Sequence, residues 1–167
     1  MKAHSGRINA SIYGQESNPT TWRLAKMNLA IRRIDAHLGD GHEDTLLNDN
    51  FPDLRADFAI VNPPFNIKDW GYDSLKDDER WVYGVPPKGN ANYAWIQHYL
   101  HHLSPNGMAG IVMSNGSLST SQKEEKSIRE KILNSDKLDC VIMLPDKLFT
   151  NTNISACIWI IANNKND

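Results

Sequence analysis

Apolar residues along the chain recur at two different spacings, and each spacing predicts a different element. Residues 7–13 alternate between apolar and polar side chains, which is the period of a strand with one buried face. From Asn18 onward, apolar residues return every three or four positions as far as Leu38, which is the period of an amphipathic helix. Asn18 and Pro19 suit the cap and the first position of that helix. The chain is therefore expected to open with a strand followed by a helix.

Short apolar runs later in the chain predict buried strands separated by helices. Apolar side chains at helical spacing predict a helix over residues 92–103, and a capping box at Ser121 opens a charged helix that continues to Leu133. The expected strands are residues 58–61, 108–113, 138–144 and 154–162. This alternation indicates an α/β fold with a mainly parallel sheet, and the short connection between the last two strands is compatible with an antiparallel edge.

The strand at residues 58–61 ends abruptly at Asn62-Pro63-Pro64-Phe65, which forms a candidate site. Two consecutive prolines have fixed φ and no amide hydrogen, so this loop is stiff. Open α/β sheets build their sites at the carboxyl ends of such strands. The Asn62 amide and the Pro63 carbonyl can accept two hydrogen bonds from an amino group on a planar ring, on which Phe65 can stack. The alternative is a Pro-Pro turn that only ends a strand.

Two acidic residues are candidates for binding a nucleoside. Glu16 follows the first expected strand, where an acid can accept hydrogen bonds from ribose hydroxyls, as in dinucleotide-binding sheets. Asp44 lies in a polar segment, residues 37–50, and could receive the amino group of an adenine ring. Each has a simpler alternative, because Glu16 could be a surface turn residue and Asp44 could cap a helix.

Residues 66–90 form a long connection that is rich in aromatic side chains. Loops longer than about 15 residues are usually functional or disordered, and the aromatic residues argue against disorder. The aromatic residues are Trp70, Tyr72, Trp81 and Tyr83. Their rings could stack on the bases of a nucleic acid. A lid packed on its own aromatic residues and a docking insertion for another subunit are the alternatives.

Charge and hydropathy narrow the classes of partner. The 167 residues carry a formal net charge of −2, whereas proteins that bind nucleic acid by themselves are usually basic. If the chain acts on DNA, another protein is therefore expected to supply most of the contacts to phosphate. The chain has no apolar run near the ~20 residues that span a membrane, and its first residues lack the apolar core of a signal peptide. We expect a cytoplasmic protein that makes no membrane contact.

Three histidines at helical spacing raise the question of a metal site. His98, His101 and His102 lie at i, i+3 and i+4 of an expected helix. The glutamate of the HExxH motif is absent, and no carboxylate or thiol pair is close in sequence. We therefore predict that the chain binds no metal.

Several short motifs, taken in order, make the chain similar to a known family. They are residues 13–16, 18–28, 44–46, 62–65, 80–84, 90–94, 114–116 and 144–149. With these motifs the chain resembles the amino-DNA methyltransferases, and most closely the catalytic core of modification subunits from type I restriction–modification systems. The resemblance covers nearly all of the sequence, and it implies that residues 1–167 form part of a Rossmann-like class I methyltransferase domain.

The resemblance also implies a reaction and a set of site residues. S-adenosyl-L-methionine would be the cofactor, and its methyl group would pass to the amino group of an adenine in DNA. Glu16 would hold the ribose hydroxyls of the cofactor and Asp44 would contact its adenine. Asn62, which also borders the cofactor, and the Pro63 carbonyl would accept hydrogen bonds from the target amino group. Phe65 would stack on the flipped base.

The same resemblance implies that the protein does not act alone. The expected partners are double-stranded DNA with a flipped adenine, a DNA-specificity subunit and a second modification subunit, with a restriction subunit as a further partner. The recognition sequence would be read by the specificity subunit.

The chain departs from the family at the cofactor loop. The glycine-rich loop that follows the first central strand in the family has no counterpart, and Gly39-Asp40-Gly41 follows a helix instead of a strand. The sheet is expected to lack its first central strand, which would lie between the strands of residues 7–13 and 58–61 and would leave two open edges. We expect such a fragment to bind the cofactor poorly and to have little or no activity until the upstream segment is supplied.

Two other functions share some of these features. A glutamine-directed protein methyltransferase uses a similar Asn-Pro-Pro loop, although the loop usually ends in tyrosine there and the aromatic segment 66–90 would be unexplained. A non-catalytic remnant that serves as an assembly module is the second alternative. It predicts that replacing Asn62 changes nothing measurable.

Overall fold

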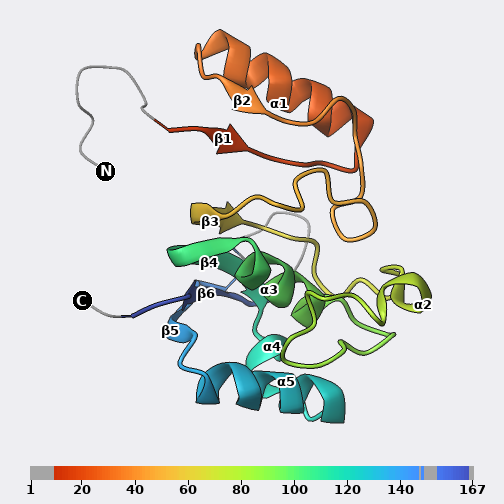
Figure 1. Cartoon of the computed structure of the whole chain (residues 1–167). Coiled ribbons are helices and arrows are strands. Elements are labelled where there is room, and N and C mark those ends of the chain that lie inside the picture. Colours follow the sequence, from red (N-terminus) through yellow and green to blue (C-terminus); the bar gives the residue numbers. More distant parts are fainter. Residues whose placement is uncertain (1–9, 147, 149–153, 166–167) are drawn as a thin grey trace. The chain divides into compact units, whose positions relative to one another are not determined.

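The computed structural model describes residues 10–146, 148 and 154–165, which form two compact units (Figure 1). The amino-terminal unit is Met1–Phe51 and the carboxyl-terminal unit is Pro52–Asp167. Each unit is described by itself. Within the described residues, no helix has both the length and the apolar character needed to cross a membrane.

The amino-terminal unit contains a short parallel strand pair and one helix. Strands β1 (Ile12–Tyr13) and β2 (Ala36–His37) pair in parallel, and α1 (Pro19–Ile31) connects them. The predicted cap is confirmed, because the Asn18 side chain accepts hydrogen bonds from two backbone amides of the first turn. The first strand is shorter than predicted, and the part of it over residues 7–9 lies outside the described residues.

The prediction that α1 continues to Leu38 is wrong. The helix stops at Ile31 because Arg33 adopts a left-handed conformation, with a φ of 54°. The amides of Arg33 and Ile34 then donate to the carbonyls of Ala30 and Leu29, at 3.0 Å each, which closes the helix in a Schellman-type ending. The apolar residues beyond this point therefore belong to the turn and to β2.

The carboxyl-terminal unit is built on a four-stranded sheet with the order β3-β4-β6-β5. The strands are β3 (Ala56–Val61), β4 (Leu103–Ser114), β5 (Leu138–Met143) and β6 (Ala156–Ala162). β3 and β4 are parallel, and β6 is antiparallel to both β4 and β5. Three strands thus share one direction, and the antiparallel strand lies next to the outermost one. This confirms the predicted α/β fold with a mainly parallel sheet and antiparallel pairing at one edge.

The boundary between the second long helix and its following strand differs from the prediction. Helix α3 covers Asn92–His101, and β4 starts at Leu103 instead of Met108. The strand can begin earlier because Gly107 lets the backbones of β3 and β4 approach each other closely. A Cβ at this position would lie 2.5 Å from the carbonyl oxygen of Ala56 in β3. Only glycine fits this contact.

The core of the carboxyl-terminal unit lies on one face of its sheet. Side chains from α3, α5 (Lys123–Asn134), β4 and β6 form a single buried cluster there. Its members are Tyr93, Ile96, Leu100, Leu103, Ala109, Ile111, Met113, Ile128, Ile132, Cys157, Trp159 and Ile161. The shorter helices α2 (Tyr72–Leu75) and α4 (Gly116–Ser119) lie in the connections that follow β3 and β4. The cluster gives the unit a rigid base from which the loops project.

Helix α5 begins one residue later than its predicted capping box. Gln122, and not Ser121, is the cap, and its side-chain oxygen accepts a hydrogen bond from the Glu125 amide at 2.8 Å. Within the helix, Lys126 and Glu130 form an ion pair at i, i+4 spacing, with 3.8 Å between nitrogen and oxygen.

β1 and β3 are edge strands in the described sheets, and these are the two strands between which a missing strand was expected. Among the described residues β1 pairs only with β2, and β3 pairs only with β4. On the face of β3 that points away from the core, Phe58 is 73% exposed and Ile60 is 93% exposed. An edge strand with such side chains is unusual for a mainly parallel sheet, in which both faces are normally covered. β3 is thus the exposed edge of the sheet formed by the described residues.

Candidate functional site

The loop Asn62-Pro63-Pro64-Phe65 begins where β3 leaves the sheet. Val61 is the last residue of β3 that pairs with β4, whereas β4 continues for three more residues, to Ser114. Pro63 is buried and anchors the loop, while Asn62 and Pro64 are exposed and Phe65 is half-buried. The Asn62 side chain is therefore exposed at the carboxyl end of β3, where the sequence placed the loop.

Two polar atoms next to this exit have unused hydrogen-bonding capacity. Ser114 is 3% exposed, and neither its hydroxyl oxygen nor the side-chain oxygen of Asn115 has a hydrogen-bond partner among the described residues. Buried polar atoms of this kind are normally satisfied by protein, water or ligand. The end of β4 therefore offers a hydroxyl group and an amide oxygen beside the position that β3 vacates.

The residue after Phe65 is tied to the start of α3. Asn66 has a φ of 57°, and its backbone amide donates to Oδ1 of Asn92 at 3.0 Å. Nδ2 of Asn92 donates in return to Oδ1 of Asn66 at 2.9 Å. Asn92 is only 3% exposed. Residues 90–94 form one of the motifs that carry the family resemblance, but the sequence alone predicted no role for Asn92. The one sequence signal for this contact is Asn66 itself, because asparagine adopts the left-handed conformation more readily than most residues.

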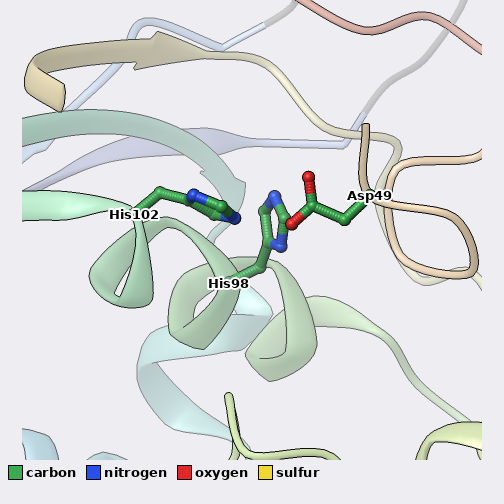
Figure 2. A group of neighbouring side chains, drawn as sticks. All are labelled: Asp49, His98 and His102. Carbon is green, nitrogen blue, oxygen red and sulfur yellow. The ribbon is translucent and has the colours of Figure 1, made fainter. Parts of the chain in front are cut away.

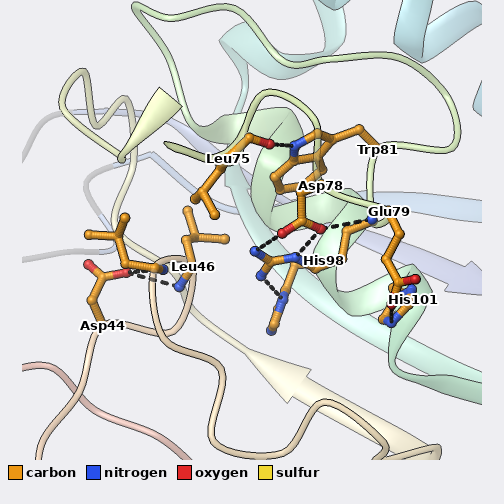
Figure 3. A network of polar contacts seen from close by, with 10 residues as sticks. Asp44, Leu46, Leu75, Asp78, Glu79, Trp81, His98 and His101 are labelled. Atoms are coloured by element: carbon orange, nitrogen blue, oxygen red, sulfur yellow. Dashed lines mark hydrogen bonds and ion pairs between the residues drawn. The ribbon is translucent and has the colours of Figure 1, made fainter. Parts of the chain in front are cut away.

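The two acidic candidates lie in the amino-terminal unit. Oε1 of Glu16 accepts a hydrogen bond from the Asn18 amide at 2.8 Å, and the Glu16 carbonyl accepts one from the Glu43 amide at 3.0 Å. The structure thus brings the loops that carry Glu16 and Asp44 together. Oδ1 of Asp44 accepts from the amides of the residues two and three positions later, at 2.9 and 3.0 Å (Figure 3).

Asp44 therefore caps a turn, which is close to the simpler alternative considered from the sequence. A carboxylate has two oxygens, so a local cap occupies only part of its accepting capacity. Both Glu16 and Asp44 are compatible with holding hydroxyl or amino donors of a nucleoside. The loop of residues 62–65 belongs to the carboxyl-terminal unit.

Comparison with known proteins decides the family. The chain matches the N-6 DNA Methylase family over residues 1–167. It belongs to this family. A type I restriction enzyme HindI methylase subunit from Haemophilus influenzae is 52% identical over 166 residues, which are 99% of this chain and 38% of that protein. The MjaIX methylase subunit from Methanocaldococcus jannaschii is 42% identical and covers 94% of this chain and 29% of that protein.

Solved structures agree with this assignment. A type I restriction-modification methyltransferase subunit from Streptococcus thermophilus superimposes with a TM-score of 0.82 and 31% identity, over 92% of this chain and 34% of that one. A putative class I S-adenosylmethionine-dependent methyltransferase from Listeria monocytogenes matches with a TM-score of 0.72 and 16% identity, over 96% of this chain and 46% of that one, which shows the fold alone. The chain thus spans less than half of each of these proteins, and the predicted resemblance is confirmed.

In this N-6 DNA methylase chain, the aromatic loop of residues 66–90 packs on itself. Trp70 is 3% exposed and Trp81 is 7% exposed, and their rings meet edge to face at 5.7 Å. The indole nitrogens of Trp70 and Trp81 donate to the carbonyls of Pro87 and Leu75 (Trp81 in Figure 3). Trp70 and Trp81 thus pack within their own loop, which fits the alternative of a lid packed on its own aromatic residues. Tyr72 is half-buried and contacts Trp70 edge to face.

Arg80 forms an ion pair within this loop and a hydrogen bond that joins the loop to α3. Nε and Nη2 of Arg80 donate to the two carboxylate oxygens of Asp78 at 2.8 and 2.7 Å, and Nη1 lies 3.0 Å from Nδ1 of His98 (Figure 3). A guanidinium group can only donate, so Nδ1 of His98 accepts and the ring proton lies on Nε2. The hydrogen bonds from Arg80 lower the pKa of Asp78 below its ordinary value of 3.8.

This pKa shift makes the stability of the chain sensitive to acid. A carboxyl group whose pKa is lower in the folded than in the unfolded chain stabilises the folded state above its ordinary pKa. That stabilisation is lost as the pH falls through the lower, folded value. We therefore expect the free energy of unfolding, measured in urea, to decrease as the pH is lowered below about 4, with a shallower decrease for Asp78→Asn. The exposed neighbour Asp77 provides the charge-matched control, Asp77→Asn. Equal slopes for Asp78→Asn and wild type would contradict the role of this pair.

The other histidines of α3 are also engaged by the protein. The rings of His98 and His102 lie next to each other, with centroids 4.5 Å apart (Figure 2). Nδ1 of His102 lies 3.1 Å from the carbonyl oxygen of Leu54, to which it donates. Burial lowers the pKa of His101, and the electrostatic effects of His102, Arg55 and Arg80 lower it further. His98 and His102 thus each use Nδ1 in a hydrogen bond within the protein. The absence of a bound metal remains a prediction.

Proposed function

We propose that this chain is part of an S-adenosylmethionine-dependent enzyme that methylates the amino group of adenine in DNA, within a type I restriction–modification system. The observation that carries the proposal is the accessible Asn62 amide at the carboxyl end of β3, inside a stiff Asn-Pro-Pro-Phe loop. Membership of the N-6 DNA Methylase family supports it, because this family name specifies the amino group that is modified. The relatives named above are methylase subunits of type I restriction enzymes.

The loop residues would act by holding and polarising the target amino group. Oδ1 of Asn62 and the carbonyl oxygen of Pro63 accept hydrogen bonds from the two amino hydrogens, which raises electron density on the nitrogen. Pro64 keeps the loop stiff, so the acceptors need little reorganisation. Phe65 stacks on the flipped adenine.

Glu16 and Asp44 of the amino-terminal unit carry carboxylates that can accept the hydrogen bonds a nucleoside cofactor donates. When bound, S-adenosylmethionine supplies a methyl group attached to a positively charged sulfur. The carboxylate of Glu16 accepts hydrogen bonds from its ribose hydroxyls, and the Asp44 carboxylate accepts one from its adenine amino group. As the family resemblance implies, Asn62 would also contribute to holding the cofactor.

The proposed partners follow from charge and from the family. The net charge of −2 does not favour tight binding to DNA by this chain alone. A DNA-specificity subunit, a second modification subunit and a restriction subunit would complete the assembly. The specificity subunit would select the site and supply most of the contacts to phosphate.

Calorimetric titration tests the cofactor site. We expect S-adenosylmethionine to bind weakly to the 167-residue chain and more tightly when the upstream segment of a modification subunit is supplied. In the completed protein, Glu16→Ala should weaken binding by about tenfold or more, because it removes charge-assisted hydrogen bonds. Glu43→Ala, which removes an exposed acid from the same region, should leave the affinity unchanged. Absence of binding in the completed protein, or equal binding by Glu16→Ala and wild type, would refute the assignment.

The identity of the methylated substrate needs a second measurement. Transfer of a labelled methyl group to duplex DNA, with no transfer to glutamine-containing peptides, is the expected result in the completed assembly. Label in peptides and not in DNA would favour a glutamine-directed protein methyltransferase instead.

A further inference from the structure

A reciprocal pair of hydrogen bonds, here called the asparagine clasp, joins Asn66 to Asn92. Asn66 donates through its backbone amide and accepts through its side chain, while Asn92 uses both atoms of its side-chain amide. A third bond runs alongside, from the amide of Ala91 to the carbonyl of Ile67 at 2.9 Å. The clasp therefore closes the base of the long aromatic loop at the residue that directly follows Phe65.

The Asn92 side of the clasp is held rigidly. Asn92 is the first residue of α3, and its backbone amide donates to Oδ1 of Asn90 at 3.0 Å. The next residue, Tyr93, is fully buried in the core cluster, and its hydroxyl donates to the carbonyl of Ser117 at 2.6 Å. A buried amide on a helix that is fixed at its first turn offers a stationary pair of hydrogen-bonding groups.

The Asn66 side of the clasp is the part that needs support. Its φ of 57° is a left-handed conformation that residues other than glycine adopt uncommonly, although asparagine tolerates it better than most. Such a conformation persists when surrounding contacts determine it. The reversal at Asn66 sets the direction in which the chain leaves Phe65, so the clasp influences the loop of residues 62–65 from its far end.

The aromatic loop has internal contacts that do not depend on the clasp. Trp70 donates to the carbonyl of Pro87 at 3.1 Å, and Lys88 forms an ion pair with Asp73 at 2.7 Å. The clasp is therefore not required to fold the loop itself. Its distinctive effect is to fix the junction between that loop and the residues 62–65.

We propose that Asn92 is a positioning residue for adenine methylation, which acts through Asn66 to hold the loop of residues 62–65 in the shape that receives the target base. This inference rests on the proposed function. Preorganised acceptors contribute to catalysis only when they are held in place, and a misplacement of about 1 Å can reduce a rate by about 100-fold. Asn92 itself needs no contact with the substrate.

The chain offers variants that break the clasp from either side and one that retains it. Asn92→Ala removes both bonds of the clasp, whereas Asn66→Ala removes only the bond that Nδ2 of Asn92 donates to the Asn66 side chain. Asn66→Asp retains both bonds, because the backbone amide is unchanged and a carboxylate oxygen still accepts from Nδ2 of Asn92. Asn106→Ala is the matched control, since it breaks another asparagine pair, Asn106 with Asn164 at 3.1 Å, at an exposed position.

The first measurement is methyl transfer to duplex DNA by the complete modification enzyme that contains this chain. We expect Asn92→Ala and Asn66→Ala to lower kcat by about 10- to 100-fold, with little change in KM for the cofactor. Asn66→Asp should stay within about threefold of wild type, and Asn106→Ala should be unchanged. Wild-type kcat in both alanine variants would overturn the proposal, as would an equal loss of kcat in Asn66→Asp.

The second measurement is native-state hydrogen exchange on the same variants. The amides of Asn66 and Ala91 should exchange faster when the clasp is broken, whereas core amides such as those of Ile111 and Trp159 should keep their protection. If the core amides lose protection equally, Asn92 has only a structural role and the proposal fails. If Asn92→Ala does not fold, Asn66→Ala still tests the proposal through kcat and through the exchange of the Ala91 amide, because it removes one of the two bonds of the clasp.

The failure of this inference can be told apart from a failure of the proposed function. Asn62→Ala tests the function, because it removes an acceptor and leaves the clasp intact. If Asn62→Ala methylates adenine at the wild-type rate, the proposed function is wrong. If Asn62→Ala is inactive while Asn92→Ala and Asn66→Ala retain wild-type kcat, the function stands and the positioning role is wrong.

Discussion

Asn62→Ala in the complete modification enzyme is expected to reduce the rate of adenine methylation by about 100- to 1,000-fold, the size of effect seen when one preorganised hydrogen-bonding group is removed from a reacting centre. The side chain is exposed at the end of β3, so its loss should not unfold the chain. Single-turnover transfer of a labelled methyl group to duplex DNA measures this effect directly. Cofactor affinity and the melting temperature should change little, which would place the defect in the reaction itself.

The variant Asn62→Asp separates the accepting role from the other properties of the side chain. Aspartate retains an oxygen at the accepting position but has no amide nitrogen. If accepting a hydrogen bond from the target amino group is the main role, Asn62→Asp should be considerably more active than Asn62→Ala. Equal activity of Asn62→Ala and wild type would favour the alternative that the chain is a non-catalytic assembly module.

Trp159→Ala is expected to cause the largest loss of stability, with a decrease of about 3–5 kcal/mol in the free energy of unfolding. Trp159 is fully buried in β6, and it pairs with Ile111 of β4 on one side and with Val141 of β5 on the other. Its indole nitrogen donates to the Ser117 hydroxyl at 3.0 Å. Truncation would leave a cavity at the centre of the sheet and remove this hydrogen bond.

Tyr93 connects Trp159 to the same anchor. The two rings meet edge to face at 6.1 Å, and burial raises the pKa of Tyr93 to about 12, so its hydroxyl remains a donor to the Ser117 carbonyl near neutral pH.

Urea unfolding measures the loss expected for Trp159→Ala. Globular domains are stable by only about 5–15 kcal/mol, so the decrease in the free energy of unfolding should be evident. Trp159→Phe fills most of the volume and should cost much less. Equal losses for the two variants would show that the hydrogen bond, and not the cavity, dominates.

The amino-acid sequence by itself determined the features that depend on neighbouring residues. Asn18 followed by proline predicted the start of α1, because capping involves only the first turn. The loop of residues 62–65 was placed correctly after a strand, because two prolines end any strand wherever it lies. The same loop, with the other motifs in order, identified the family. These signals are local, so they could be read without knowledge of the fold.

Only the tertiary structure decided the features that join distant parts of the chain. The clasp links positions that are 26 residues apart, and nothing in the local pattern indicates that Asn66 and Asn92 meet. The start of β4 at Leu103 depends on its pairing with β3, and the burial of Trp70 depends on its contact with Trp81. In each case the deciding interaction is made by a residue that is remote in sequence. Periodicity and composition cannot specify such a partner, because they describe each segment alone.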